Sequence, residues 1–389
     1  LRAQDRPGGR GLRRPWMRRV LHTGSGMRLA LTHAAALAGA LAAYGLGAPL
    51  PFMIGALTAV AALGLAGVRT ATHRACRNGG LSVLMTGIGL GFTPAAAAEA
   101  LDQLPLILGA AALTVAFGCA IAPLLASLAG TDRRTAFFCA VPGGPAEMSL
   151  MGERHGADAA PVAISQLLRI VTLVVVLPPA LTVAGVAGDA PPGAPGLAAF
   201  HPAGLVVTLA LSLHLGAFLR WLGLSTGFLF GPMLVGLGFG LSGTAPSAIP
   251  LWLMQAAQVV MGAYLGAQFQ PEIVRAMRRF MPAAALSVAL LAGGCAALGV
   301  ALHWVNGASV PTMLLATAPG SVTEMSITAA ALGLDTALVT AFHLPRIVVV
   351  LVLVAPAFAL MRRLGLLDGP AIETPGGAAP KAPPPLTTG

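Results

Sequence analysis

Long apolar runs dominate this sequence and limit what it can fold into. A helix needs about 20 consecutive apolar residues to cross a membrane, and we find candidate spans at 28–46, 50–67, 79–97, 104–128, 158–182, 203–222, 226–242, 250–268, 282–304 and 335–360. Only 9% of the residues are charged, whereas soluble domains carry about 25%. A β-barrel would need alternating strands of about 10 residues, and the sequence shows no such alternation. The sequence therefore predicts an all-α integral membrane protein with about 10 transmembrane helices.

Small clusters of arginine supply most of the net charge of +10. Cytoplasmic loops of membrane proteins collect Lys and Arg, so we interpret these clusters as topology signals. Nucleic-acid binding would instead need one continuous basic face in a soluble module, and we expect no direct nucleic-acid partner. The clusters are Arg10, Arg13, Arg14, Arg18 and Arg19; Arg69, Arg74 and Arg77; Arg133 and Arg134; Arg275, Arg278 and Arg279; and Arg362 and Arg363.

The cysteines and histidines show no pattern of a metal or redox site. The four cysteines are scattered, without a CxxC motif or a Cys/His spacing, so we expect them to be small apolar packing residues. The sequence accordingly predicts no metal, no cofactor and no catalytic residue.

Two stretches of the chain repeat each other. The sequence VPGGPAEMS at 141–149 returns as APGSVTEMS at 318–326, so that Pro142 corresponds to Pro319. Extending the alignment at this offset without a gap gives 16 identities in 39 positions between 142–180 and 319–357. Duplicated halves of this kind are typical of secondary transporters. We predict a basic cytoplasmic leader at 1–26, membrane repeats at 27–182 and 203–363 joined by a linker at 183–202, and a disordered tail at 364–389.

The arginine clusters help to decide how the two halves are oriented. If each half crosses the membrane five times, the second half is inverted and every cluster lies in the cytoplasm. If 135–155 crosses fully, each half has six crossings, the halves are parallel, and the cluster at 275–279 lies outside. We prefer two inverted five-helix repeats, each with a broken or re-entrant Pro-Gly element. Both termini of this multi-pass protein then lie on the cytoplasmic side of a bacterial inner membrane.

Each repeat breaks its helix with proline and glycine and then places an acid after the break. Unwound backbone at membrane depth requires surrounding protein or a water-filled cavity, and the freed N–H groups favour an anion. A simple proline kink is the alternative. The acids could carry a proton, bind Na⁺ or pair with an arginine, or face water at the end of a hairpin. The motif residues that we assign to the site are Pro142, Gly143, Gly144, Glu147 and Ser149, with Pro319, Gly320, Glu324 and Ser326 in the second copy.

Arg169 and Arg346 each lie in the middle of an apolar segment. Eleven residues separate each from an aspartate, which is about three turns, or some 16 Å, along the same helix face. A buried arginine binds an anion or a carboxylate, so these two residues clamp a substrate anion, form structural Glu–Arg pairs, or divide these two roles between them. The predicted site also includes the other polar residues of this stripe, which are Asp158, Gln166, Asp335 and His343. His343 could shuttle protons, whereas its counterpart Gln166 could not.

The doubled motif resembles a known family. Pro-Gly-Gly-x-x-Glu-Met-Ser, then Gly-x-Asp and Leu-x-Arg, is similar to the AbrB-type bacterial inner-membrane family, whose members carry an internal duplication. The resemblance covers about 28–360, although the second copy has Ser321-Val322-Thr323 where the first has Gly144-Pro145-Ala146. Family members are labelled as regulators of gene expression or as ammonia monooxygenases. The second label conflicts with the dispersed histidines, because ammonia oxidation needs a metal site.

The residues and the resemblance together predict a transporter rather than an enzyme. The inverted halves with broken elements resemble the cation/proton antiporter and anion transporter superfamily, which is an analogy of fold. We expect a secondary transporter of a small organic anion or metabolite, coupled to H⁺ or Na⁺. The alternative is a membrane regulator or sensor that affects gene expression indirectly. The expected partners are membrane lipids, a small anionic ligand and H⁺ or Na⁺, with a homodimer left open.

Overall fold

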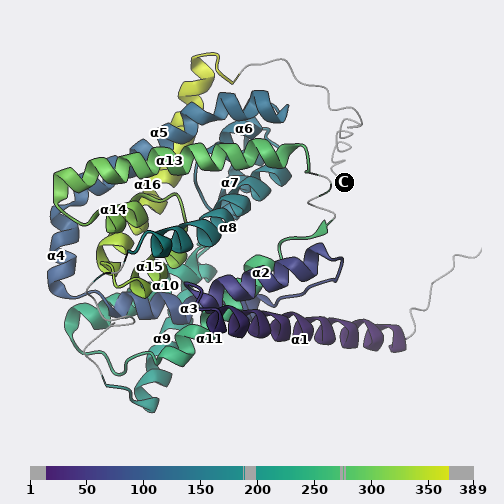
Figure 1. Cartoon of the computed structure of the whole chain (residues 1–389), viewed down its shortest axis with the longest axis vertical. Coiled ribbons are helices and arrows are strands. Elements are labelled where there is room, and N and C mark those ends of the chain that lie inside the picture. The colour runs from purple at the N-terminus through teal and green to yellow at the C-terminus, as the bar shows by residue number, and fades with distance from the viewer. Residues whose placement is uncertain (1–14, 187, 189–198, 272–274, 276, 368–389) are drawn as a thin grey trace, which may run out of the picture.

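Two helix bundles make up the described part of the chain (Figure 1). The computed structural model describes residues 15–186, 188, 199–271, 275 and 277–367, and these residues form helices and no strands. The first bundle contains α1 (Pro15–Gly45), α2 (Pro51–Leu65), α3 (Arg74–Leu90), α9 (Pro202–Trp221), α10 (Gly227–Ser242) and α11 (Leu251–Gly266). The second contains α5 (Leu104–Ala129), α6 (Arg133–Ala140), α7 (Pro145–Arg154), α8 (Ala159–Val183), α13 (Phe280–Asn306), α14 (Val310–Thr317), α15 (Val322–Ala331) and α16 (Thr336–Arg363).

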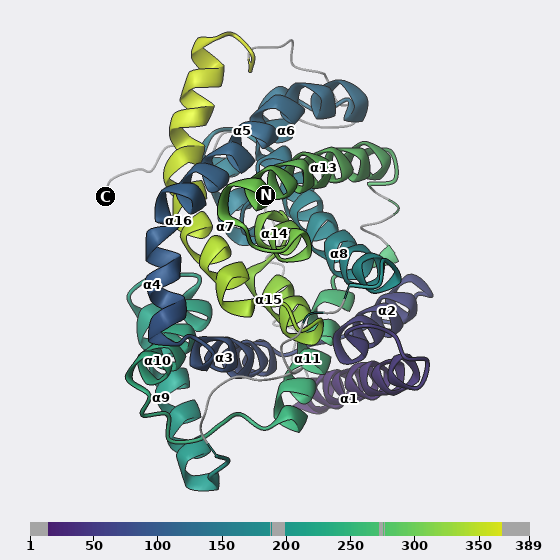
Figure 2. The same cartoon turned by 60° about the vertical axis from the view of Figure 1, so that its left-hand side comes forward.

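The bundles meet where α15 and α16 contact α3, and α4 (Pro94–Asp102) links α3 to α5. One apolar cluster spans this interface, since Val171 and Val174 of α8 and Ile327 of α15 pack with Leu84 and Met261 of the first bundle. Figure 2 shows α1 and α2 beside each other at one edge of the first bundle, away from α5 and α16. A cavity between the bundles can therefore be lined by both.

The helix boundaries repeat with the offset found in the sequence. Helices α6 and α14, and likewise α7 and α15, coincide at both ends when the first copy is shifted so that Pro142 falls on Pro319. Helices α5 and α8 correspond to α13 and α16, with small differences at their ends. The first bundle repeats in the same way. Helices α2 and α3 of the first half correspond to α10 and α11 of the second half, and α2 packs on α11 while α10 packs on α3.

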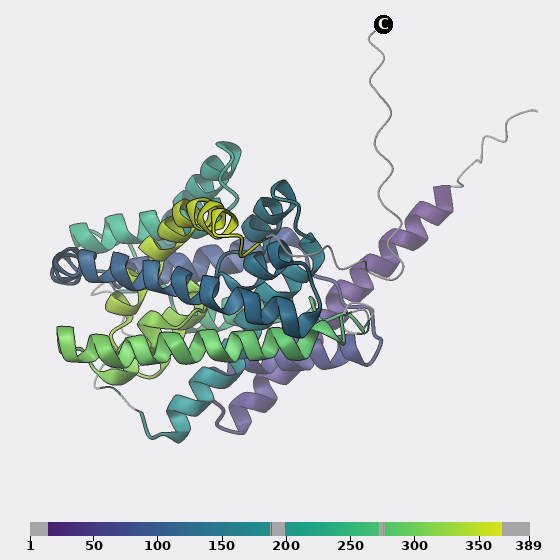
Figure 3. The ribbon, with the colours of Figure 1, turned by 90° about the horizontal axis from the view of Figure 1, so that it is seen from above.

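Helices α5 and α13, which are equivalent in the two halves, run antiparallel. The start of α5 lies at the end of α13, where Asn306 Nδ2 donates a hydrogen bond of 3.1 Å to Gln103 Oε1. The end of α5 lies at the start of α13, because Leu125 and Phe280 belong to the same buried cluster. Figure 3 shows α5 and α13 lying alongside each other.

The predicted all-helical architecture is confirmed for the described residues, and the number of long spans is smaller than predicted. Six helices are long and apolar enough to cross a membrane: residues 26–45 within α1, and the whole of α5, α8, α9, α13 and α16. The predicted spans at 50–67, 226–242 and 250–268 form helices of only 15 or 16 residues. The span predicted at 79–97 is bent by 88° between α3 and α4, where Thr93 caps α4 and Pro94 begins it.

The predicted leader, linker and tail lie partly outside the described residues. Residues 1–14, 187, 189–198 and 368–389 are not described, so the assignments there stay predictions. Within the predicted leader, α1 already begins at Pro15. The first repeat therefore begins within a longer helix than the apolar pattern alone indicated.

Glycines bring helices of the first bundle into close contact. Gly89 of α3 and Gly236 of α10 face each other, and a Cβ atom placed on Gly236 would lie 3.0 Å from Gly89 Cα. Gly39 and Gly55 bring α1 and α2 together in the same manner. Small residues at helix crossings are typical of membrane proteins, where close backbone packing replaces the hydrophobic drive between helices.

Candidate functional site: two helix breaks and two buried arginines

Both predicted breaks are present as gaps between short helices. Helix α6 ends at Ala140 and α7 begins at Pro145, while α14 ends at Thr317 and α15 begins at Val322. Proline lacks the N–H that helix continuation needs, which explains why each break contains one. Each gap leaves carbonyl groups of the preceding helix and N–H groups of the following helix without helical partners. Side chains or a ligand must satisfy these groups if the site excludes water.

The first break is held by Arg169 and Gln166. Arg169 Nη2 donates to the carbonyl oxygen of Gly143 at 2.9 Å, and its Nη1 donates to Gln166 Oε1 at 2.6 Å. Gln166 Nε2 in turn donates to the carbonyl oxygens of Phe138 at 2.8 Å and Val141 at 2.9 Å. A buried polar network of this kind fixes the geometry of the break because every lost bond would leave an unpaired group.

The second break is held by the equivalent residues. Arg346 donates through Nη1 to the carbonyl oxygen of Ala318 and through Nη2 to that of Gly320. His343 Nε2 lies 2.9 Å from the carbonyl oxygen of Leu315. Both arginines are buried, with exposed fractions of 5% for Arg169 and 9% for Arg346, so each guanidinium is largely withdrawn from water.

The arginines donate to backbone carbonyls, and Arg169 also to Gln166, rather than to the glutamates. In the described residues neither guanidinium forms an ion pair with Glu147 or Glu324; the donors go to the breaks instead. The structural Glu–Arg pair that the sequence left open is therefore not the role seen here. Two donors of each five-donor guanidinium are used in this way, which leaves N–H groups free for a ligand.

Gln166 and His343 make equivalent bonds despite their different chemistry. Their acceptors, the carbonyl oxygens of Phe138 and Leu315, occupy matching positions in the two copies of the repeat. In both residues the Nε2 atom bonds a carbonyl oxygen near the end of the helix that precedes the break. We infer that His343 serves here as a hydrogen-bond donor.

Replacing His343 with glutamine should therefore be tolerated. We expect His343→Gln to retain the bond to Leu315 and to unfold with wild-type stability within about 1 kcal/mol. His343→Ala should lose about 2 kcal/mol, because the buried carbonyl then lacks its partner. Thermal unfolding of the purified variants measures both effects. Equal destabilisation by His343→Gln and His343→Ala would contradict the role of His343 as a hydrogen-bond donor to Leu315.

The two breaks and the two arginines line one cavity. Its volume is about 150 Å³, and its polar lining comes from Arg169, Arg346, Glu147 and the break residues, with Thr226 from the first bundle. The N-termini of α7 and α15 also begin at its wall, and helix N-termini favour anions. With two guanidinium groups and one carboxylate, the side-chain charge of this cavity is positive, and we call it the anion cavity after the kind of ligand that such a charge favours. Apolar residues complete its wall: Ile170, Leu229, Val322, Ile347, Val350 and Leu351.

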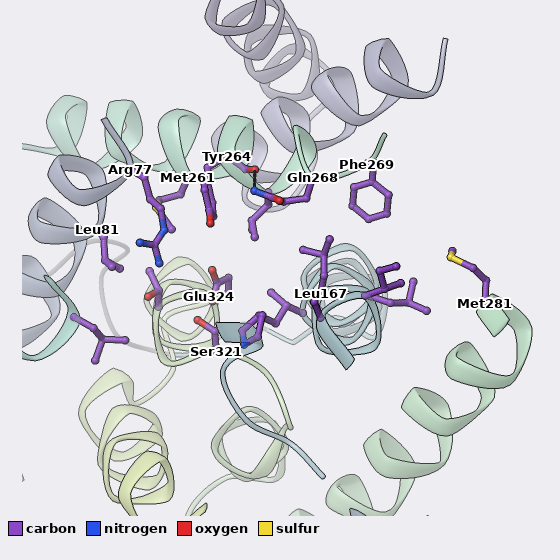
Figure 4. Close-up of a pocket in the computed structure, with 18 residues that line it drawn as sticks. Arg77, Leu81, Leu167, Met261, Tyr264, Gln268, Phe269, Met281, Ser321 and Glu324 are labelled. Carbon is purple, nitrogen blue, oxygen red and sulfur yellow. Dashed lines mark hydrogen bonds between the residues drawn. The ribbon is translucent and has the colours of Figure 1, made fainter. Parts of the chain in front are cut away.

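A second, larger cavity adjoins the anion cavity. Its volume is about 310 Å³, and it contains Glu324 and Thr323 from the second bundle with Arg77, Tyr264 and Gln268 from the first. Figure 4 shows Arg77, Tyr264 and Gln268 on one side of the open space and Glu324 on the other. The apolar residues Leu167 and Met281 lie further to the right in this view. Three residues line both cavities: Ile170, Leu229 and Ser321.

The predicted aspartates and serines of the site lie outside these two cavities, and Asp335 instead lines a separate cavity of about 580 Å³. Asp158 and Asp335 are exposed and cap the N-termini of α8 and α16, accepting hydrogen bonds from Ala160 N at 3.0 Å and Leu338 N at 2.9 Å. Ser149 Oγ lies 3.4 Å from a backbone oxygen, and Ser326 Oγ is 2.7 Å from Thr340 Oγ1. We assign the aspartates to helix capping and the serines to local packing.

Sequence reasoning missed the site residues that the first bundle contributes. Arg77 was interpreted only as a topology signal, and Tyr264 and Gln268 belong to a segment without a recognised motif. Ser225 donates a hydrogen bond of 2.5 Å to Glu147 from a loop 78 residues away. Contacts between the bundles have no local pattern in the sequence. The repeat indicated the two breaks of the second bundle, but it did not indicate which residues of the first bundle face them. In the described residues no group of three or more His, Cys, Asp or Glu side chains could hold a metal ion.

Comparison with known proteins places the chain in a family. A family model described as transition state regulatory protein AbrB matches residues 52–362. The chain belongs to the AbrB family. The match covers both repeats and both breaks, which confirms the resemblance drawn from the doubled motif.

Two relatives within the AbrB family extend this match. A protein of Escherichia coli strain K12 named "Putative regulator AbrB" is 28% identical over 258 residues, covering 66% of this chain and 73% of that protein. The uncharacterized protein YhjN of Bacillus subtilis strain 168 is 27% identical over 268 residues, covering 62% of this chain and 69% of that protein. No solved structure matches the chain.

Proposed function

We propose that this protein is a secondary transporter of a small organic anion, coupled to H⁺ or Na⁺. The observation that carries the proposal is the single cavity lined by two helix breaks and two buried arginines. Burying two guanidinium groups without carboxylate partners is costly, and an anionic ligand would offset that cost. At about 30 Å³ per water molecule, a cavity of about 150 Å³ suits a small anion.

The membrane arrangement that we propose has two inverted five-helix repeats with both termini in the cytoplasm of a bacterial inner membrane. Support comes from the antiparallel course of α5 and α13, since parallel six-helix repeats would make these equivalent helices parallel. Arg133 donates to the carbonyl oxygen of Leu366 at 3.3 Å, and Phe280 packs with Met361. These contacts bring the arginine clusters at 133–134, 275–279 and 362–363 to one end of the second bundle, as a common cytoplasmic side requires.

The position of the cavity suggests how access would alternate. Thr226 and Leu229 belong to the first bundle, whereas the breaks and arginines belong to the second. Ser225 bonds to Glu147 across this interface. We propose that the bundles rock against each other around the bound anion, while the arginines keep the breaks in place.

A ligand screen tests the proposal directly. We expect small anions, supplied as sodium or potassium salts of acetate, succinate, benzoate and phosphate, to raise the melting temperature of the purified protein. A ligand at 100 times its dissociation constant stabilises by about 2.7 kcal/mol. A stabilising anion should then exchange across proteoliposomes that contain the protein. If no anion in a broad panel binds or exchanges, a transporter of small anions is the wrong assignment.

A membrane regulator is the second candidate, favoured by the name of the Escherichia coli relative. In this case the same cavity would bind a ligand and alter a partner protein without moving the ligand. Deleting the gene should then change transcript levels, and a variant that binds the anion but cannot transport it should restore them. Restoration only by transport-competent protein would favour the transporter, with regulation as an indirect result.

A further inference from the structure

The two repeated glutamates lie in different surroundings. Glu324 has an exposed fraction of only 3%, and its Oε2 atom has no hydrogen-bond partner among the described residues. Its counterpart Glu147 is half-buried and accepts a hydrogen bond from Ser225. The duplication has therefore placed equivalent acids at two breaks but has left only one of them deeply buried with an unsatisfied oxygen.

Glu324 lines the larger cavity opposite Arg77. The Arg77 guanidinium lies 4.9 Å over the ring centre of Tyr264, and its buried Nε has no acceptor in the described part of the chain. Figure 4 shows Arg77 and Tyr264 on the first-bundle side of the cavity and Glu324 on the other side. Acid and base thus face each other from different bundles without forming an ion pair in the described residues.

We propose that Glu324, and not Glu147, takes up the coupling ion as a proton, and that Arg77 balances its charge when the proton leaves. This inference rests on the proposed function, because it names the ion that drives the same transporter. Protonation requires only a free carboxylate oxygen, which Oε2 provides. Ionisation requires a compensating cation, which Arg77 provides from across the cavity.

The surrounding charges favour H⁺ over Na⁺. Sodium is a hard cation that needs several oxygen ligands, as calcium and magnesium do, and nearby cations would repel it. The titratable side chains on helices that pack against α15 are Arg74, Cys76 and Arg77 on α3, Arg169 on α8, and His343, Arg346, Arg362 and Arg363 on α16. Tyr264 of α11 also lines the cavity, and Glu147 of α7 lines the anion cavity instead. Among the described residues, Glu324 is the only carboxylate that lines this cavity, so a sodium ion would meet one acid here.

Glu324 lies close to the anion cavity, and this closeness would couple proton binding to anion binding. Ser321 precedes α15 and lines both cavities, so Glu324 lies on the helix that begins between them. An ionised Glu324 offsets part of the positive potential of the arginines, and protonation removes that negative charge. Anion binding should therefore be tighter when Glu324 is protonated. The sign of this coupling makes the transporter a symporter of an anion and a proton.

Infrared difference spectroscopy of the full-length protein in lipid tests the proposal without a known ligand. Changing the pH should reveal the carbonyl band of a carboxylic acid in an apolar environment. We expect this band to be absent in Glu324→Gln and unchanged in the matched variant Glu147→Gln. Arg77→Gln should move its titration midpoint up by about one pH unit, because an opposite charge has been removed.

Three results would overturn the proposal. The band could persist in Glu324→Gln, its midpoint could stay the same in Arg77→Gln, or it could titrate at lower pH in Na⁺ than in K⁺, which would indicate Na⁺ competing for the carboxylate. Failure of the transporter assignment can be told apart from failure of the proton site. The first is measured by anion binding and exchange in the wild-type protein, and the second by the infrared band in the variants. If anions bind and exchange but the band does not depend on Glu324, the transporter stands and the proton site does not.

Discussion

Replacing Arg346 with alanine is expected to abolish anion transport and to weaken the fold at the second break. The side chain supplies one of two positive charges at the anion cavity and holds the carbonyl oxygens of Ala318 and Gly320. We expect anion affinity to fall about 100-fold, or roughly 2.8 kcal/mol, and unfolding stability to fall by about 3 kcal/mol, because charged hydrogen bonds are lost and buried carbonyls stay unpaired. Arg169→Ala should behave similarly through Gly143 and Gln166.

Two matched variants separate these effects. Arg346→Lys keeps the charge but loses the planar fork, so it should recover part of the anion affinity but not the two-carbonyl clamp. Arg154→Ala removes an exposed arginine at the end of α7 and should leave binding and stability unchanged. Binding follows from anion-dependent melting temperatures, and transport from anion exchange in proteoliposomes. Full transport in both Arg169→Ala and Arg346→Ala would refute the anion clamp.

Gly236→Leu is expected to disrupt the first bundle. A Cβ atom at this position would lie 3.0 Å from Gly89 Cα and 3.0 Å from Leu90 N. Because these are backbone atoms, rotamer changes cannot relieve the overlap, and α10 must move away from α3. Overpacking of a well-packed core costs about 1–3 kcal/mol or more, and we expect the upper end here. The variant should give little monodisperse protein and a lowered melting temperature.

Gly238→Leu is the control on the same helix. Its Cβ atom would have no neighbour within 4 Å, and the position is exposed. This variant introduces the same side chain and the same change in backbone entropy, but without a steric overlap. We expect it to purify and melt like the wild type. Equal behaviour of the two variants would mean that close packing of α3 on α10 does not limit stability.

The sequence repeat predicted much of the fold, because duplicated segments keep matching residues at a constant offset along the chain. Both breaks occur where proline and glycine indicated them, and one constant offset relates the helix boundaries from α5 to α8 to those from α13 to α16. Arg169 and Arg346, which the sequence assigns to one site, line the same cavity. Span lengths were predicted less well, since apolar composition does not show where a helix bends or stops.

The differences between the halves could not be read from the repeat. Gln166 and His343 differ in chemistry but make equivalent bonds, whereas Glu147 and Glu324 are identical but have different environments. Burial and partners come from neighbouring helices that are distant in the chain, as with Ser225 beside Glu147. An offset alignment compares each residue with its counterpart and contains no information on these neighbours.

The sequence by itself determined the helical class, the duplication, the two breaks and the pair of arginines, because apolar run length, proline and glycine act locally along the chain. Only the tertiary structure decided what the arginines hold, which acid is buried and which residues of the first bundle reach the site. Hydrogen bonds to the break carbonyls and the cavity between the bundles depend on how antiparallel helices pack. Such packing joins residues that are far apart in the chain, and no local pattern in a single sequence encodes it.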